Sequence, residues 1–325
     1  MNAWLDWGLP IIEWLQSLGP GLAGPMGLLS FTGNEEFFLI VMPAFLWCFD
    51  VRLGLRLGMI LVGSALINGP LKLAFGWPRP YWVSERVLAL SSETSFGLPS
   101  GHAQNALAVW GRLAAGLRGR AAAILLGLLI VLISISRLFL GVHYPADMLA
   151  GWAVGGLLLY AFVRGEAAVV GWLRRFSVPA RIGWVGVVAL ALLLLNGAVF
   201  AATAGRPVPE AWAANAAAAA PDADPIHPRS LDGAFANSGL LFGIGAGGVL
   251  LMAWGGFDAG GPAGKKLARY VIGVIGVLVL WMGLRMLFPR GDDLVSQVLR
   301  MVRYGLLGFW AAYLAPRLFV RLRLA

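Results

Sequence analysis

The sequence predicts an all-α, polytopic membrane protein, because of its composition and its repeated apolar segments. Of its 325 residues, 59% are hydrophobic and only 13% are charged, whereas a soluble domain carries roughly 25% charged residues. The mean hydropathy is +0.78. Apolar runs approaching the length of about 20 residues that a spanning helix needs recur along the chain. We therefore expect the bilayer, rather than water, to surround most of the protein.

The apolar runs divide into two groups. We expect spanning helices near residues 33–49, 54–75, 101–117, 121–139, 147–164, 180–203, 233–256, 268–288 and 297–316. The stretch 204–232 is rich in Ala, Pro and Asp, which is typical of an exposed linker. It separates a six-helix core, residues 31–203, from a three-helix C-terminal extension, residues 233–325.

Residues 1–30 form a separate N-terminal region. They contain no Lys or Arg, whereas a signal peptide opens with a positively charged region, so we expect no cleavable leader. Apolar residues alternate with Asp6, Glu13 and Gln16 at helical spacing, which predicts an amphipathic helix lying in the membrane interface. The start of the first spanning helix is the alternative. The apolar residues in this pattern are Trp4, Leu5, Ile11, Ile12, Leu15 and Leu18.

The net charge of +9 is spread in short groups between the apolar runs. Nucleic-acid binding would need a basic cluster on one soluble face, so we expect no nucleic-acid partner. One set of alternating loops holds fifteen of the 25 basic residues, which places those loops in the cytoplasm by the positive-inside rule. In a bacterial-type cytoplasmic (inner) membrane the N-terminus would then lie outside and the C-terminus inside. The fifteen are Arg52, Arg56, Arg112, Arg118, Arg120, Arg164, Arg174, Arg175, Arg181, Lys265, Lys266, Arg269, Arg317, Arg321 and Arg323.

Three segments on the opposite side interrupt the apolar pattern with ionisable groups: 72–80, 97–102 and 136–147. Charged groups near membrane depth are costly and indicate function. From His102 to Arg137 is 35 residues, about the length of two spanning helices joined by a short turn. The chain therefore returns to the same face, and the three segments are predicted to form one extracytoplasmic site.

The basic residues of these segments suit a phosphate group. Lys72, Arg79 and Arg137 supply three cations, and an arginine fork matches phosphate oxygens bidentately. Ser100 and the backbone N–H groups that open the third helix add donors at a helix N-terminus, which is a natural anion site.

The histidines suit nucleophilic catalysis. His143 has a carboxylate four residues further on, with Pro145 between them at a plausible first helical position. Asp147 can then fix the tautomer of the ring and leave the other nitrogen free to attack. His102 can protonate the leaving oxygen.

The spacing Lys72-x6-Arg79-Pro80, then Pro99-Ser100-Gly101-His102, then Ser136-Arg137-x5-His143-x3-Asp147 resembles the three-part signature of the type 2 phosphatidic acid phosphatase (PAP2) superfamily. The resemblance covers residues 30–203. It implies a phosphohistidine at His143, oriented by Asp147, with His102 acting first as acid and then as base. It also implies that Lys72, Arg79, Ser100, Gly101 and Arg137 hold the phosphate, with no metal and no cofactor. The superfamily includes soluble vanadate-dependent haloperoxidases, but the spanning helices favour its lipid phosphatase branch.

Three functions stay open from the residues. The first is hydrolysis of a phosphorylated lipid such as undecaprenyl diphosphate, phosphatidic acid, phosphatidylglycerol phosphate or a sphingoid phosphate. The second is a transporter or flippase that uses the cations only to bind head groups, which would not need His143, Asp147 and His102. The third is transfer of the phosphate to an alcohol other than water. The stretch 81–98 either covers the site or simply connects two helices, and we expect His227 to be structural.

Overall fold

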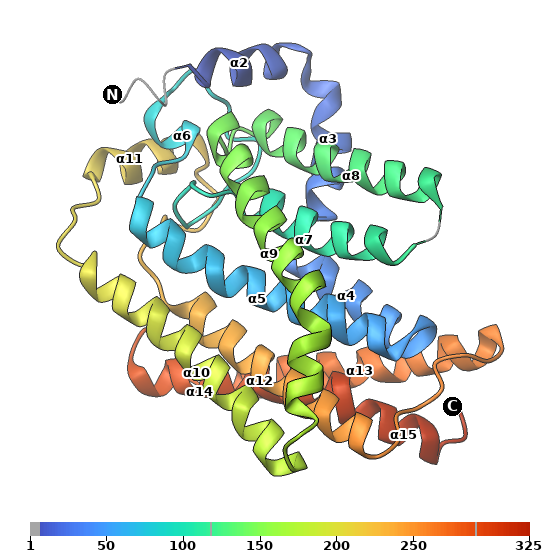
Figure 1. Ribbon diagram of the computed structural model, residues 1–325. Helices are drawn as coiled ribbons and strands as arrows, with labels where there is room; N and C mark the ends of the chain where they lie inside the picture. The colour runs from blue at the N-terminus through green and yellow to red at the C-terminus, as the bar shows by residue number, and fades with distance from the viewer. Residues whose placement is uncertain (1–6, 118, 290) are drawn as a thin grey trace. The chain divides into compact units, whose positions relative to one another are not determined.

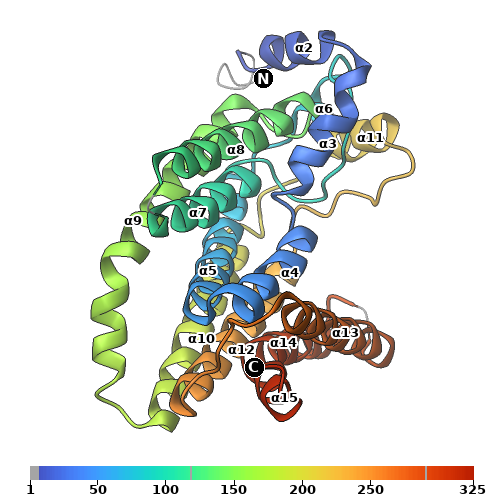
Figure 2. The ribbon, with the colours of Figure 1, turned by 90° about the vertical axis from the view of Figure 1, so that its right-hand side faces the viewer.

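The computed structural model describes residues 7–117, 119–289 and 291–325, and every regular element in these ranges is helical (Figure 1, Figure 2). The predicted all-α, polytopic fold is therefore confirmed. Six helical segments in the described ranges are long and apolar enough to cross a membrane. They are Val51–Val83, Arg120–Phe139, Pro145–Leu173, Val178–Ala202, Asp232–Ala253 and Ala263–Leu287.

The other three predicted spans are helical but shorter or interrupted. The first consists of α4 (Glu35–Ala44) and a wider π-helical turn, Phe45–Phe49. The second is α7 (Gly101–Gly116), a 16-residue helix with Gln104, Asn105 and Arg112 on its buried face. The third is broken into α14 (Leu294–Phe309), a π-helical turn and α15 (Ala315–Arg321). Polar residues within these runs lower the hydropathy that a spanning helix requires.

The predicted N-terminal amphipathic helix corresponds to α2 (Leu9–Ser17), followed by α3 (Ala23–Phe31). The helix α2 buries Leu9, Ile12 and Leu15 on one face and exposes Trp14 on the other. Trp4, Leu5 and Asp6, which belonged to the same predicted pattern, lie outside the described residues, as does Arg118 of the basic loops. The position of α2 in a membrane interface stays a prediction.

The chain divides into two compact units that do not follow its linear order. The first unit comprises the chain up to Phe37 together with Ile67–Tyr160 and Ala198–Ser230, and the second comprises Phe38–Leu66, Ala161–Gly197 and Leu231–Ala325. The helices α5 (Val51–Phe75), α9 (Pro145–Leu173) and α10 (Val178–Ala202) contribute to both. The domain boundaries expected from the sequence, at 203 and 232, stay a prediction.

The first unit contains all the predicted site residues. In both views α7 lies beside α8 (Arg120–Phe139), as expected for two helices joined by a short turn (Figure 1, Figure 2). The apolar core of this unit includes Trp82, Phe96, Phe139 and Tyr144, which lie within or close to the three ionisable segments in the sequence. Apolar packing therefore fixes the backbone on which the site residues are carried.

Residues 204–230 of the predicted linker belong to the first unit. They contain α11 (Glu210–Ala219), which packs on the short helix α6 (Pro80–Val83), as Figure 1 shows. The Trp212 and Trp82 rings lie 6.1 Å apart, and Asn215 donates a hydrogen bond to the Trp82 carbonyl (2.9 Å). The backbone N–H of His227 donates to the Thr94 carbonyl (3.0 Å). Residues 204–230 thus contact both ends of the loop that precedes α7.

The second unit is held by close packing of helices. The helices α12 (Asp232–Ala253) and α14 form its most extensive contact, and α13 (Ala263–Leu287) packs against α14 and the turn after it. A Cβ atom at Gly239 would lie 2.0 Å from the Met301 carbonyl oxygen, and one at Gly243 would lie 2.1 Å from that of Gly305. Glycine at these positions allows the two backbones to touch, which is a common device between helices in membranes.

Candidate active site

The centre of the site is the pair formed by His143 and Asp147. His143 lies in the turn between α8 and α9, and Asp147 lies in the first turn of α9, which begins at Pro145. The ring Nδ1 is 3.0 Å from Asp147 Oδ2, and the same oxygen accepts the backbone N–H of Tyr144 (2.9 Å). Both side chains are buried, with exposures of 1% and 0%. A carboxylate held in this way favours the tautomer with the proton on Nδ1, so Nε2 keeps its lone pair.

The Nε2 atom of His143 faces Arg79. The guanidinium Nη1 lies 3.3 Å from Nε2 and donates to the Val142 carbonyl (3.0 Å). Because a guanidinium only donates hydrogen bonds, this contact also requires an unprotonated Nε2. Burial, followed by the charges of Arg79, Arg137 and Lys72, lowers the pKa of His143 well below its usual range. The ring is therefore neutral at physiological pH, as a nitrogen nucleophile must be.

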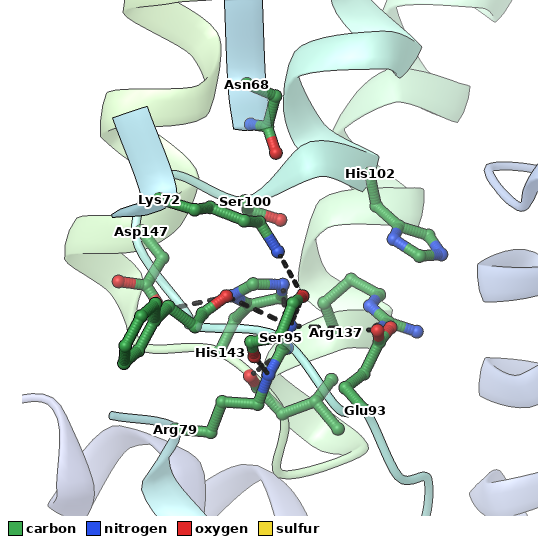
Figure 3. Close-up of polar contacts among 12 residues, drawn as sticks. Asn68, Lys72, Arg79, Glu93, Ser95, Ser100, His102, Arg137, His143 and Asp147 are labelled. Atoms are coloured by element: carbon green, nitrogen blue, oxygen red, sulfur yellow. Dashed lines mark hydrogen bonds and ion pairs between the residues drawn. The ribbon is translucent and has the colours of Figure 1, made fainter. Parts of the chain in front are cut away.

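Loop residue Ser95 connects two of the predicted phosphate-binding cations. Its hydroxyl oxygen accepts from Lys72 Nζ (2.9 Å) and from Arg79 Nη2 (3.1 Å), as Figure 3 shows. Arg79 also donates to the Ser95 carbonyl (2.6 Å) and to the Phe96 carbonyl (3.2 Å). A hydroxyl oxygen thus takes the donors that a phosphate oxygen would take.

Glu93 contacts Arg137, the third predicted phosphate-binding cation, as Ser95 contacts the other two. Its carboxylate forms an ion pair with Arg137 and lies 3.6 Å from Arg79 Nη2. Burial opposes the negative charge, but Arg79 and Arg137 outweigh it and hold the pKa of Glu93 far below its usual range. Arg137 donates its Nη1 to Ser30 (2.6 Å), and its buried Nε has no hydrogen-bond partner among the described residues. Loop residues 93–96 therefore supply an anion and several of the hydrogen-bond acceptors of the cation cluster.

The loop 81–98 is thus more than a connection between helices. The sequence predicts either a cover over the site or a plain connection, and it does not single out Glu93 or Ser95. The only available signal is a carboxylate and a hydroxyl that lie between the first and second motifs.

The turn that opens α7 is positioned by buried polar groups. Ser100 caps the helix by accepting from the Ala103 N–H (3.4 Å), and its own N–H donates to the Asp147 carbonyl (2.9 Å). Asn68, one helical turn before Lys72, donates to the Pro99 carbonyl (3.2 Å). A Cβ atom at Gly101 would lie 3.3 Å from Asn68 Oδ1. These contacts bring the second motif against both the first and the third.

His102 lies on the side of the cluster near Arg137 and Glu93 (Figure 3). Its Nε2 lies 2.6 Å from Asn34 Oδ1, a partner that sequence reasoning did not find. The structure therefore brings together all eight predicted site residues in one unit. They are Lys72, Arg79, Ser100, Gly101, His102, Arg137, His143 and Asp147. Within the described ranges, no group of three or more His, Cys, Asp or Glu side chains is arranged to hold a metal ion.

Comparison with known families gives two matches along the chain. Residues 53–170 match the PAP2 superfamily. Residues 235–325 match the family described as "PAP2 superfamily phosphatase, transmembrane extension". The first match contains every predicted site residue, and the second covers most of the predicted C-terminal extension.

Curated relatives include several phosphatases. Phosphatidylglycerophosphatase B of Bacillus subtilis (strain 168) is 34% identical over 121 residues, which is 34% of this chain and 57% of that protein. Sphingosine-1-phosphate phosphatase 1 of Rattus norvegicus is 29% identical over 136 residues, 40% of this chain and 32% of the relative. Glucose-6-phosphatase 3 of Bos taurus is 27% identical over 225 residues, 60% of each chain. The matches thus span between about a third and three fifths of these relatives.

Among solved structures, similarity is found to a transmembrane PAP2-type phosphatidylglycerolphosphate phosphatase from Bacillus subtilis. That structure has a TM-score of 0.45 and 26% identity, covering 52% of this chain and 89% of the other. LpxE of Aquifex aeolicus has a TM-score of 0.43 and 21% identity, covering 49% and 95%.

Proposed function

Because this chain belongs to the PAP2 superfamily and carries its transmembrane extension, we propose that it hydrolyses the phosphate monoester or diphosphate of a membrane lipid. The observation that carries the proposal is the His143–Asp147 pair, whose Nε2 lone pair faces a cluster of three cations. A head-group binder would need the cations but would have no use for a neutral imidazole oriented by a buried carboxylate.

The chemistry proceeds in two steps. His143 Nε2 attacks phosphorus, the bond to the leaving oxygen breaks, and that oxygen takes a proton from His102. Water then attacks phosphorus, His102 accepts a proton from it, and the bond to Nε2 breaks to release inorganic phosphate. Lys72, Arg79 and Arg137 stabilise the charge on the phosphoryl oxygens in both transition states. A phosphate of the substrate would replace Ser95 and Glu93 as the acceptor for these donors.

A lipid substrate suits the surroundings of the site. The chain is a multi-pass membrane protein, so a lipid whose acyl or prenyl chains stay in the bilayer can present its phosphate at the surface. Two of the relatives are named for phosphorylated lipids and one for a sugar phosphate. Undecaprenyl diphosphate, phosphatidic acid, phosphatidylglycerol phosphate and a sphingoid phosphate are the candidates, and glucose 6-phosphate is the soluble comparison.

Purified protein in detergent is expected to release inorganic phosphate from at least one of these lipids in excess EDTA. Magnesium sites use carboxylates, and both carboxylates of this site are already engaged, Glu93 by arginines and Asp147 by His143. Orthovanadate is expected to inhibit, because it adopts the five-coordinate geometry of the phosphorus in the transition state. The measurement is phosphate release across the panel, with and without each reagent.

If none of the substrates releases phosphate, the proposed phosphatase activity is refuted. Loss of activity in EDTA that a divalent ion restores would refute the metal-independent mechanism. Phosphate recovered on an added alcohol, in place of free phosphate, would identify a transferase.

We also propose that the site faces the extracytoplasmic side of the membrane, because the basic loops lie on the opposite side of the predicted topology. Single cysteines at Ala218 and Ala325, both exposed, are introduced in a Cys48→Ala background. An impermeant maleimide is expected to label position 218 in intact cells and position 325 only after lysis. Labelling at 325 but not at 218 would show the reverse orientation. Cys48 itself is buried.

A further inference from the structure

The turn between α3 and α4 reaches the active site from outside both family-matched regions. Asn34 accepts a hydrogen bond from His102 Nε2 (2.6 Å), and Ser30 accepts one from Arg137 Nη1 (2.6 Å). The matched regions begin at residues 53 and 235. The three-part signature therefore does not contain these two contacts, although each involves one of its residues.

The turn is shaped to bring its backbone against the His102 ring. A Cβ atom at Gly33 would lie 3.1 Å from His102 Cδ2 and 3.0 Å from Ile133 Cγ2, so a larger residue would press on the ring and on α8. Two backbone hydrogen bonds hold the turn that follows α3. The Gly33 N–H donates to the Ser30 carbonyl (2.9 Å), and the Asn34 N–H donates to the Phe31 carbonyl (3.0 Å). Asn34 is thus presented to Nε2 by an ordered backbone.

We propose that Asn34 is a positioning residue for His102. This inference rests on the proposed function. The amide oxygen accepts a hydrogen bond from Nε2–H in both the neutral and the protonated ring. This leaves Nδ1 as the atom that exchanges a proton with the leaving oxygen and with water. Asn34 thereby fixes which ring nitrogen performs acid–base chemistry and where it points. A neutral amide does so without adding a charge that would hold the proton on the ring.

The charged groups around His102 come from several elements. Arg137 comes from α8, Glu93 from the loop before α7, Lys72 from the end of α5, and Arg79 from the start of α6. The Asn34 side chain bonds to none of these four groups in the described part of the chain, so a variant at this position tests the contact with His102.

The activity test compares two leaving groups. Asn34→Ala is expected to lower kcat/KM roughly 10- to 100-fold for a lipid phosphate, whose alkoxide leaving group needs a proton. For an ester of p-nitrophenol, which leaves without protonation, the change is expected to stay within about threefold. Asn34→Asp, which adds a carboxylate, is expected to move the alkaline limb of the pH profile of kcat/KM upward by roughly one unit. Thr32→Val is the matched control, because among the described residues the Thr32 hydroxyl bonds only to the Leu29 carbonyl of α3 and not to a site residue.

A second measurement does not depend on turnover. The chain has only three histidines, so ¹⁵N-histidine labelling gives a simple spectrum in which His102 Nε2 is expected to be protonated in the wild-type protein. Asn34→Ala is expected to shift this tautomer equilibrium, whereas Thr32→Val leaves it unchanged.

An unchanged His102 spectrum in Asn34→Ala would overturn the inference whatever the activity shows. Equal losses for both leaving groups would also overturn it, because they would indicate a general structural effect. If the wild-type protein releases no phosphate from any ester but Asn34→Ala still shifts the His102 spectrum, the proposed phosphatase activity is refuted and the contact between Asn34 and His102 is supported.

Discussion

Replacement of His143 by alanine is expected to abolish phosphate release, with a loss of at least about 10⁴-fold in kcat. The variant lacks the atom to which the phosphoryl group is transferred, and water is the only nucleophile left. His102→Ala is expected to lose about 10²- to 10⁴-fold, since it removes a proton donor and leaves the nucleophile in place. Combining the two substitutions is expected to add little to the first, because both residues act in one step.

The measurement is release of inorganic phosphate from the best lipid of the panel, with stability compared by thermal unfolding in detergent. His227→Ala is the matched control, because His227 belongs to none of the three motifs and its backbone hydrogen bond to the Thr94 carbonyl does not depend on its side chain. Near wild-type turnover by His143→Ala would exclude the phosphohistidine mechanism.

The second large effect is expected for Asp147→Asn, which keeps the size of the side chain and removes its charge. Asp147 is fully buried, and one of its oxygens accepts from both His143 Nδ1 and the Tyr144 N–H. An amide that turns its NH₂ group toward the ring would favour the tautomer with the proton on Nε2, which cannot attack. For a buried Asp–His pair in a hydrolase, this change costs about 10⁴-fold in kcat, and we expect about 10³- to 10⁴-fold here.

Single-turnover labelling with a ³²P-substrate isolates the affected step. Asp147→Asn is expected to form the acid-labile phosphoprotein more slowly, while the affinity for orthovanadate changes little. The same carboxylate-to-amide change at exposed Glu210 on α11 is expected to have no effect. A variant at position 147 that keeps more than about a tenth of wild-type kcat would contradict the role of orienter.

The sequence was sufficient to predict the main features of the fold and the grouping of the motif residues. The apolar runs identify helices, and the distance from His102 to Arg137 implies a helical hairpin, which α7 and α8 form. Apolarity was less informative about helix length. The run that became α7 is interrupted by polar side chains that tertiary packing buries, and the run near the C-terminus is divided between α14 and α15.

The residues that sequence reasoning missed share a physical character. Asn34, Glu93 and Ser95 are short or common polar residues in turns, and such residues usually serve the turn itself. Their relation to His102 and to the cations depends on chain segments that meet only after folding. Asn68 could not be predicted because it lies inside an apolar helix and its partner, the Pro99 carbonyl, is 31 residues further along the chain. No local pattern distinguishes these side chains from ordinary ones.

The division of the chain into units has a consequence for biosynthesis. The motif residues lie between 72 and 147, so the ribosome delivers all of them before it reaches residues 198–230. The unit that holds them nevertheless includes Ala198–Ser230, where Asn215 bonds to the Trp82 carbonyl and His227 to the Thr94 carbonyl. Two long helices, α9 and α10, must therefore be translated before these bonds can form. The first unit therefore becomes complete only after residues 198–230, which follow a segment of the second unit in the chain, have been synthesised.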